Sequence, residues 1–456
     1  YTSNSVFGRV IYSYADRYLF QANVRHDGSS RFAKGYRWGT FPSFSAGWVM
    51  SEEKFMKNLN WDWLSFLKLR GSWGMLGNER IGDNYFPYIA LMSFGNSLFY
   101  MADGSVVSDK TARPAVLAVE DITWETTTST DIGLDANFFN NRLQFHFDYY
   151  WKQTKDMLLN IEIPYFMGYN NPSTNAGKMS THGYDIELAW NDRIGDFKYG
   201  VNVNFSDFLS KIDYMNDGEQ ISGGKIKRAG VLFNEYYGYV CDGIYQTQEE
   251  VNNSARTSTT VTVGDLKYRD ISGPDGVPDG IISPEYDRVP LGNSLPRFQY
   301  GGTFNASYKG IDFSIAFQGI GKQNSYLSTA MVQPLRDNFG NVPSILEGKY
   351  WSPFNTAEEN LSAKYPRLSN VSKNNNYATS SFWMFNGSYF RLKNLTLGYT
   401  LPETWTQKAG INRVRFYVSG SDLFCLSNFP DGWDPEMSYK AYPITTSLVM
   451  GLQVNF

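Results

Sequence analysis

The sequence predicts an all-β protein, an antiparallel transmembrane β-barrel with about 13 strands in this chain. Three observations lead to this prediction. Apolar residues recur at every second position in many segments, which is the period of a strand with one buried face. Aromatic residues make up 17% of the 456 residues and charged residues only 19%, whereas a soluble domain has roughly 25% charged residues. Short and long connections also alternate along the chain.

The first four predicted strands span residues 5–14, 18–27, 37–49 and 65–76. Ala15-Asp16-Arg17 is short enough for a tight hairpin turn between the first two strands. A somewhat longer connection occupies 51–64, between the third and the fourth strand. These strands therefore begin an antiparallel sheet.

The next four predicted strands span residues 120–138, 142–158, 179–191 and 197–209. In the second of them, every odd position from Leu143 to Trp151 is aromatic or aliphatic, and the opposite face carries the polar residues Arg142, Gln144, His146, Asp148 and Lys152. The last of the four repeats this alternation. Faces with so many aromatic rings must be covered, so we expect them to lie against lipid and the polar faces to line a hydrated interior.

The last five predicted strands span residues 296–309, 311–320, 386–401, 412–423 and 444–456. The first two meet at Lys309-Gly310, a two-residue hairpin turn. The C-terminal strand has the clearest period of two, with an apolar face and a face that carries Gln453 and Asn455. We expect these two residues to face the interior and the apolar residues to face lipid. The apolar residues are Leu448, Met450, Leu452 and Val454.

The long connections alternate strictly with the short ones, so all of them join the strands at the same end. They span 77–119, 159–178, 210–295, 321–385 and 424–443. Outer-membrane barrels sort their connections in this way, with short periplasmic turns at one rim and long extracellular loops at the other, whereas a soluble β-sandwich has no reason to do so. We therefore expect residues 1–456 to form the C-terminal part of one barrel. Its longest extracellular loops are predicted at 77–119, 210–295 and 321–385, with the C-terminus at the periplasmic rim.

Charge and the start of the chain add further expectations. A net charge of -4 and a pI of about 5.6 provide no basic surface for nucleic acid. No run of about 18 apolar residues is present, which excludes a transmembrane helix. Bacterial single-chain barrels have even numbers of strands, so an odd number predicts that further strands precede Tyr1. The segment from Tyr1 to Ser5 lacks the basic and apolar stretches of a signal peptide, so we expect none in this sequence.

Six sequence blocks occur in a characteristic order. They are HDGSSRF at 26–32, RWGTFPS at 37–43, SAGW at 45–48, LKLRGSWG at 67–74, YFRLKNLTLGY at 389–399 and VSGSDLF at 418–424. Together they resemble the C-terminal barrel half of the SusC/RagA family of TonB-dependent outer-membrane transporters. His26 departs from the family pattern, which usually has Arg there, and Pro274 is inserted in one of the loops.

The resemblance implies an active importer in the outer membrane of a Gram-negative bacterium. It implies a barrel of about 22 strands around a plug domain that is absent from this chain, in contact with the lipid bilayer and lipopolysaccharide. It also implies energy from the TonB complex and a SusD-like surface lipoprotein that acts as a lid. The cargo would be a large nutrient, with glycan oligosaccharides favoured over peptides. A passive porin-type channel and an outer-membrane barrel hydrolase are the alternatives.

The sequence contains few histidines that could act as catalytic residues. His26 and Asp27 lie beside Ser29 and Ser30, but neighbours at a strand end point to opposite faces, so adjacency does not make a catalytic triad. The simpler interpretation is a strand-to-loop corner in which Gly28 provides the turn. We therefore predict no catalytic residue and no enzymatic activity. No linear motif marks a substrate site either.

The loop at 265–288 carries oxygen ligands at nearly alternate positions followed by glycine, an arrangement similar to an EF-hand calcium loop. It predicts a structural Ca²⁺ or Mg²⁺ ion and no other cofactor. The alternative is a turn rich in Gly, Asp and Pro that holds no ion. The predicted ligands are Asp270, Ser272, Asp275, Asp279 and Asp287.

Only two cysteines are present, Cys241 and Cys425, and they lie far apart in the sequence. Two cysteines do not make a disulfide framework. They form either one bridge or two inert thiols.

Overall fold

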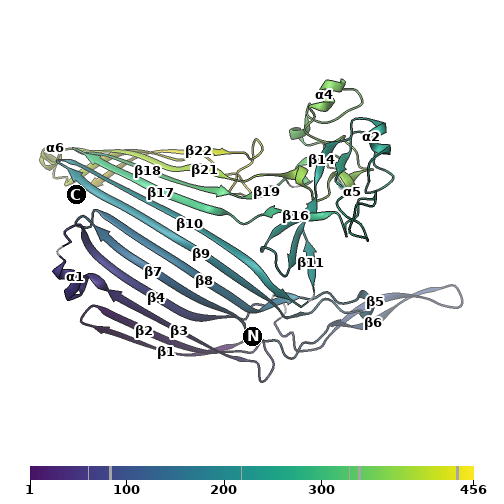
Figure 1. Ribbon diagram of the computed structural model, residues 1–456, viewed down its shortest axis with the longest axis horizontal. Coiled ribbons are helices and arrows are strands. Elements are labelled where there is room, and N and C mark those ends of the chain that lie inside the picture. Colours follow the sequence, from purple (N-terminus) through teal and green to yellow (C-terminus); the bar gives the residue numbers. More distant parts are fainter. Residues whose placement is uncertain (60, 82–84, 217, 328, 337–339, 438–440) are drawn as a thin grey trace. The chain divides into compact units, whose positions relative to one another are not determined.

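The computed structural model of the protein (Figure 1) describes residues 1–59, 61–81, 85–216, 218–327, 329–336, 340–437 and 441–456. It divides into two compact units. Unit 1 comprises Tyr1–Gln220 and Arg228–Leu232, and unit 2 comprises Ile221–Lys227 and Phe233–Phe456.

Unit 1 is built on eight long strands, each antiparallel to the next along the chain. The strands are β1 (Ser3–Tyr14), β2 (Tyr18–Ser29), β3 (Trp38–Val49), β4 (Leu64–Asn78), β7 (Glu125–Phe138), β8 (Leu143–Asn160), β9 (Ser173–Ile194) and β10 (Phe197–Met215). The connections carry η1 (Met50–Glu52), α1 (Lys54–Asn58), the hairpin of β5 (Leu91–Tyr100) with β6 (Val106–Val116), and η2 (Tyr165–Met167).

Unit 2 contains five long strands, each likewise antiparallel to the next along the chain. They are β17 (Arg297–Tyr308), β18 (Ile311–Lys322), β21 (Tyr389–Thr400), β22 (Arg413–Ser427) and β23 (Ser447–Asn455). The connection between β21 and β22 carries α6 (Glu403–Thr406) and η5 (Gln407–Ala409). The eight and five long strands confirm the thirteen that the sequence predicts, in the predicted order.

The short turns have the backbone that a tight antiparallel hairpin requires. Ala15 and Asp16 have φ of 52° and 54°, and Lys309 and Gly310 have φ of 45° and 86°. Two successive residues with positive φ produce a turn whose twist matches that of the paired strands. Only Gly310 adopts this region without strain.

The largest extensions beyond the predicted strand bounds are in two strands, β9 and β10. β9 begins at Ser173 rather than 179, and β10 ends at Met215 rather than 209. The hydrogen-bonded ladder continues through these ends, where Met215 pairs with Gly177 and Asn160 pairs with Ser173. The alternation of apolar and polar residues stops earlier than the ladder, because only a strand with one face in an apolar medium requires that alternation.

The three longest connections lie where the sequence predicts them, but they contain elements that its pattern does not reveal. Between β10 and β17 lie β11 (Glu219–Ser222), β12 (Lys225–Arg228), β13 (Glu235–Tyr239), β14 (Cys241–Ile244), α2 (Gln248–Asn252), β15 (Leu266–Tyr268) and β16 (Arg288–Asn293). Between β18 and β21 lie β19 (Asn324–Tyr326), α3 (Thr329–Val332), η3 (Ser344–Leu346), α4 (Ala357–Leu361), α5 (Lys373–Asn376), η4 (Ser381–Trp383) and β20 (Met384–Asn386).

The long strands expose many large apolar side chains on one face. On β23, Leu448, Met450 and Leu452 are 67%, 76% and 58% exposed. On the first strands, Val6, Phe20 and Phe44 are exposed as well. A continuous apolar surface of this kind needs a covering medium, and a lipid bilayer provides it for an outer-membrane barrel. Within the described part of the chain, no helix is both long and apolar enough to span a membrane.

Candidate functional site: the polar strand face and the interlocked loops

The opposite face of the unit 1 strands carries a cluster of charged side chains around Arg70 on β4. Arg70 Nε lies 3.1 Å from Asp135 Oδ1, and Arg70 Nη2 lies 2.6 Å from Asp148 Oδ2. Arg70 Nη1 also forms an ion pair with Asp131 at 3.6 Å. Gly133 stands between these residues on β7, and a Cβ there would overlap the Arg70 guanidinium. The guanidinium therefore lies flat against the backbone, where it joins three strands.

His146 belongs to the same cluster, because its Nδ1 lies 3.0 Å from Asp135 Oδ1. It thus occupies the polar face, as the alternation predicts. His26 lies elsewhere: its Nδ1 lies 2.9 Å from Thr40 Oγ1, and its ring stacks on Trp38. Neither histidine is paired with a serine.

The residues beside His26 have separate partners. Asp27 forms an ion pair with Arg25 at 2.7 Å. The Ser29 hydroxyl accepts a hydrogen bond from the Arg31 backbone N–H at 3.2 Å, and the Ser30 hydroxyl accepts one from the Thr2 backbone N–H at 2.8 Å. These contacts are those of a strand end rather than of a catalytic triad. The expectation that Gly28 provides the turn is wrong, because Gly28 lies within β2 and pairs with Asn4 and Trp38.

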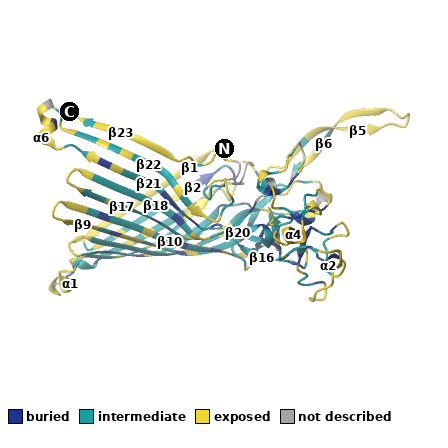
Figure 2. Ribbon diagram, turned by 90° about the horizontal axis from the view of Figure 1, so that it is seen from above, coloured by how far each residue is buried: buried dark blue, intermediate teal, exposed yellow. Residues whose placement is uncertain are grey.

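In unit 2, the β10–β17 loop and the β18–β21 loop fold together around one hydrophobic core. The first loop contributes Tyr239, Leu266, Tyr268 and Ile282, and the second contributes Leu327, Val332, Leu346 and Trp383. Figure 2 shows buried residues gathered around α2, α4 and β16. Among the described residues, neither loop has a core of its own of this size, so each stabilises the other.

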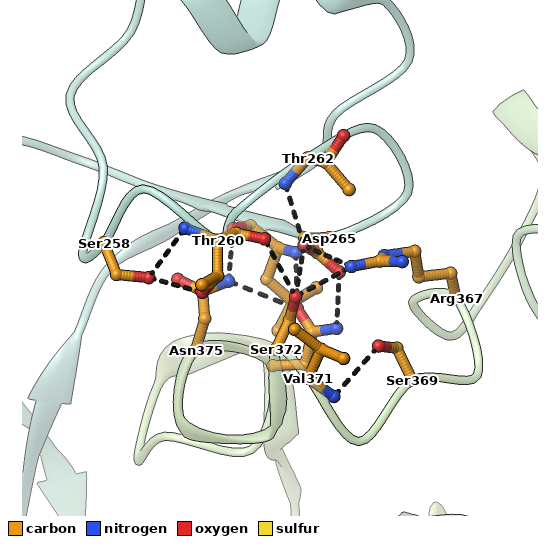
Figure 3. Close-up of polar contacts among 11 residues, drawn as sticks. Ser258, Thr260, Thr262, Asp265, Arg367, Ser369, Val371, Ser372 and Asn375 are labelled. Atoms are coloured by element: carbon orange, nitrogen blue, oxygen red, sulfur yellow. Dashed lines mark hydrogen bonds and ion pairs between the residues drawn. The ribbon is translucent and has the colours of Figure 1, made fainter.

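A buried carboxylate joins the same two loops (Figure 3). Asp265 is fully buried, and its Oδ1 lies 2.7 Å from Arg367 Nε. Ser372 Oγ donates to Asp265 Oδ2 at 2.7 Å, and Asn376 Nδ2 donates to Oδ1 at 2.9 Å. The Thr262 backbone N–H donates to Oδ2 at 2.9 Å. Every partner of Asp265 is internal, so this network is a structural clamp that offers no group to a ligand.

Both cysteines are free thiols, so the alternative of a bridge does not hold in this structure. Cys241 Sγ donates to the Gly243 carbonyl at 3.4 Å. Burial raises the pKa of the Cys241 thiol to about 11, which keeps it protonated at neutral pH.

The predicted ligands in the 265–288 loop mostly bind the loop's own backbone. Asp287 is fully buried, and its two carboxylate oxygens accept from the N–H groups of Ile271, Ser272 and Ser283. Asp270 Oδ2 accepts from Gly280 N–H at 2.7 Å.

The remaining predicted ligands have separate surroundings. Asp279 Oδ1 accepts from Ile281 N–H at 2.9 Å, the Ser272 hydroxyl faces the Gly273 carbonyl, and Asp275 is exposed. Among the described residues, no three His, Cys, Asp or Glu side chains are grouped to hold a metal ion. Asp270 Oδ1 is nevertheless buried without a hydrogen-bond partner. The cation therefore stays a prediction.

A second internal charge network was not predicted. Arg391 on β21 is 3% exposed, with its Nη2 2.6 Å from Asp434 and its Nε 2.8 Å from Glu436. Lys393 Nζ lies 2.7 Å from Asp422. Asp434 and Glu436 belong to the β22–β23 connection, so this network fastens that connection to the sheet. Its only signal in the sequence is the acidic pair beside Trp433, which gives no indication of a partner on β21.

Comparisons with known proteins agree with this architecture. The family model described as "TonB dependent receptor-like, beta-barrel" matches residues 1–419. TonB-dependent receptor P3 of Formosa agariphila is 31% identical over 99% of this chain and 45% of its own length. TonB-dependent receptor SusC of Bacteroides thetaiotaomicron is 30% identical over 99% of this chain and 43% of its own length. The chain thus spans about half the length of the curated relatives it matches.

Among solved structures, the RagAB peptide transporter matches with a TM-score of 0.78 and 23% identity, over 100% of this chain and 47% of that chain. At this identity the likeness concerns the fold. The fold, the family model and the relatives agree, and the chain belongs to the TonB-dependent receptor β-barrel family, while its similarity to SusC agrees with the resemblance seen in the sequence.

Proposed function

We propose that the chain is the barrel region of an active importer in the outer membrane of a Gram-negative bacterium, dependent on TonB for energy. The observation that carries this proposal is the match of residues 1–419 to the family model. It is supported by the two faces of the strands, one apolar and exposed, the other lined by hydrogen-bonded charged groups such as Arg70 and Asp148. A hydrated path bounded by lipid requires this division.

The importer is further proposed to work with a SusD-like surface lipoprotein as its lid. A plug domain and further barrel strands are proposed to complete it, since its relatives are about twice as long as this chain. The cargo is proposed to be a large nutrient. Glycan oligosaccharides are favoured on the SusC/RagA resemblance of the sequence, and peptides are kept as the alternative because one structural neighbour is named a peptide transporter. The two further alternatives are a passive porin-type channel and a barrel hydrolase.

Uptake by the full-length transporter tests this function. A strain that lacks the gene is complemented with the full-length gene, in backgrounds with and without TonB, and grown on oligosaccharides or on peptides as sole carbon source. We expect growth on at least one cargo class to require both the gene and TonB. Growth that persists without TonB would indicate a porin. Cleavage of the cargo by the purified transporter would indicate a hydrolase. An affinity tag on the transporter tests the partner, since a SusD-like lipoprotein should co-purify.

A further inference from the structure

Aromatic side chains mark both ends of the apolar face on the strands of unit 1. Beside the short turn between β7 and β8, Phe138 stacks on Trp63 with ring centroids 5.8 Å apart. At the other end of this face on β8, the rings of Tyr149 and Trp151 meet edge to face at 4.5 Å. Transmembrane barrels carry such girdles of aromatic residues at their two membrane interfaces.

The separation of these two girdles fits the apolar core of a membrane. Leu143 lies opposite Phe138 in the register, and eight positions separate it from Trp151 along β8. At about 3.3 Å per residue and a tilt of about 40°, these positions rise about 20 Å along the membrane normal. The apolar band of an outer-membrane barrel is about 25 Å tall. The residues that follow Trp151 therefore reach the level of the lipid headgroups, on the side of the long connections.

Beyond Trp151, the same outward face becomes polar and basic. Gln153 follows Trp151 at the period of two. It lies opposite Ser180 on β9, which in turn lies opposite Lys211 on β10. Residues that are paired across antiparallel strands point to the same face, with Cβ atoms roughly 4.5–5.5 Å apart. These polar side chains therefore stand side by side on three neighbouring strands (Figure 1).

Two further lysines lie on this face, closer to the long connections. Lys155 follows Gln153 at the same period on β8, and Lys178 precedes Ser180 at that period on β9. Lys155 and Lys211 are exposed, and Lys178 is half-buried. The three lysines are called the outer basic row below.

The outer basic row carries an excess of positive charge. Among the described residues, no carboxylate oxygen lies within 4.0 Å of any of its three ammonium groups. Asp213 lies beside the row, and its Oδ1 accepts from Ser180 Oγ at 2.9 Å. On the polar face, by contrast, Arg70 is bound by the carboxylates of Asp135 and Asp148. Basic side chains at a membrane surface that lack such partners attract anionic headgroups.

From these features we propose that the outer basic row binds the phosphate groups of lipopolysaccharide. The proposal rests on the proposed outer-membrane location, in which the long connections are extracellular and the row lies in the outer leaflet. Lipopolysaccharide is the lipid of that leaflet, and its lipid A moiety carries phosphate on sugar units. Lysine binds phosphate as a point charge. The Gln153 amide both donates and accepts hydrogen bonds, as the sugar hydroxyl groups of this lipid do.

The test uses the full-length transporter, purified in detergent and depleted of bound lipid. Its affinity is measured for lipopolysaccharide, for the same lipopolysaccharide after removal of its phosphates, for phosphatidylglycerol and for inorganic phosphate. We expect intact lipopolysaccharide to bind most tightly. Its affinity should fall at least about tenfold in the triple variant Lys155→Gln, Lys178→Gln and Lys211→Gln, because each lysine near a membrane surface contributes about fivefold.

Lys198→Gln is the matched control. Lys198 is exposed on β10, as Lys211 is, but it lies beside the short β9–β10 turn, opposite Arg193. The affinity of this variant for lipopolysaccharide should change less than about twofold. Should the triple variant fail to fold, Lys211→Gln decides the question, with Lys211→Arg as the variant that keeps the charge and the binding.

Equal affinity of the lysine variants and the unaltered transporter would overturn the proposal. Equal binding of the lipid without its phosphates would overturn it too, as would phosphatidylglycerol or inorganic phosphate bound as tightly as lipopolysaccharide. The importer function is judged separately by uptake. TonB-dependent uptake by a transporter whose lysine variants bind lipopolysaccharide unchanged refutes only the lipid site, and uptake without TonB refutes only the importer.

Discussion

Asp265 is the residue on which the interlocked loops of unit 2 depend most directly. Its carboxylate is fully buried beside Arg367, at a sequence separation of 102 residues. Asp265→Ala should leave the guanidinium without its partner, at a cost of about 3–5 kcal/mol. We expect local opening of the two loops while the membrane strands stay folded. Hydrogen exchange of the full-length transporter measures this, with the exposed Asp275→Ala as control. Equal protection in both variants would refute the clamp.

The pH dependence of Cys241 alkylation tests whether this thiol is buried. Because burial raises the pKa of its thiol to about 11, about one molecule in a thousand carries the reactive thiolate at pH 8. Alkylation of the native protein should therefore be slow at pH 8 and accelerate as the pH rises towards 11. Mass spectrometry of the Cys241 peptide follows the reaction, with urea-unfolded protein as control. Rapid modification of the native protein at pH 7 would contradict the buried position.

The predicted cation in the 265–288 loop is open to direct measurement. Asp270 Oδ1 lacks a hydrogen-bond partner, and a bound Ca²⁺ or Mg²⁺ would satisfy it. If the prediction holds, metal analysis of the full-length transporter should find about one such ion per chain, lost in Asp270→Asn. The metal content of Asp275→Asn, a change at an exposed predicted ligand, is compared with that of Asp270→Asn. If the loop is ordered in a preparation that contains no metal, the cation prediction is wrong, and the hydrogen bonds of Asp287 organise this segment without an ion.

At the scale of single elements, β23 tests the assignment of strand faces. Leu452 is 58% exposed on the apolar face, and Gln453 follows it on the other face. Leu452→Arg should cost about 2–4 kcal/mol if this position lies near the middle of the bilayer, and Gln453→Arg should cost much less. A folding titration of the full-length transporter in lipid vesicles compares the two variants. Equal losses would reverse or abolish the proposed orientation.

β23 also illustrates what a sequence can predict about such a fold. Alternation along one strand is a local signal, and it locates the thirteen long strands and their turns. The elements inside the loops are only three to six residues long in β13, β15 and β16. Their stability comes from partners far away in the sequence, such as Arg367 for Asp265, and no local period records such a pairing. The alternation likewise places His146 on the polar face without revealing its contact with Asp135.

At the scale of the whole molecule, the two outermost strands decide whether the sheet is complete. Among the described residues, β1 and β23 each have a single neighbour in the sheet order. Their outer N–H and C=O groups would meet hydrocarbon in a membrane, and each unsatisfied group there costs several kcal/mol. We therefore expect residues 1–456, expressed alone, to give protease-sensitive aggregate in place of a membrane-inserted pore.

Co-expression with the N-terminal part of the full-length transporter should restore a heat-modifiable, protease-resistant species, because added strands then pair with both edges. The measurement is gel mobility with and without heating, combined with proteolysis of isolated outer membranes. A protease-resistant monomer formed by residues 1–456 alone would show that β1 and β23 can satisfy each other. In that case the chain would form a closed barrel by itself, and the proposal that further strands complete it would have to be given up.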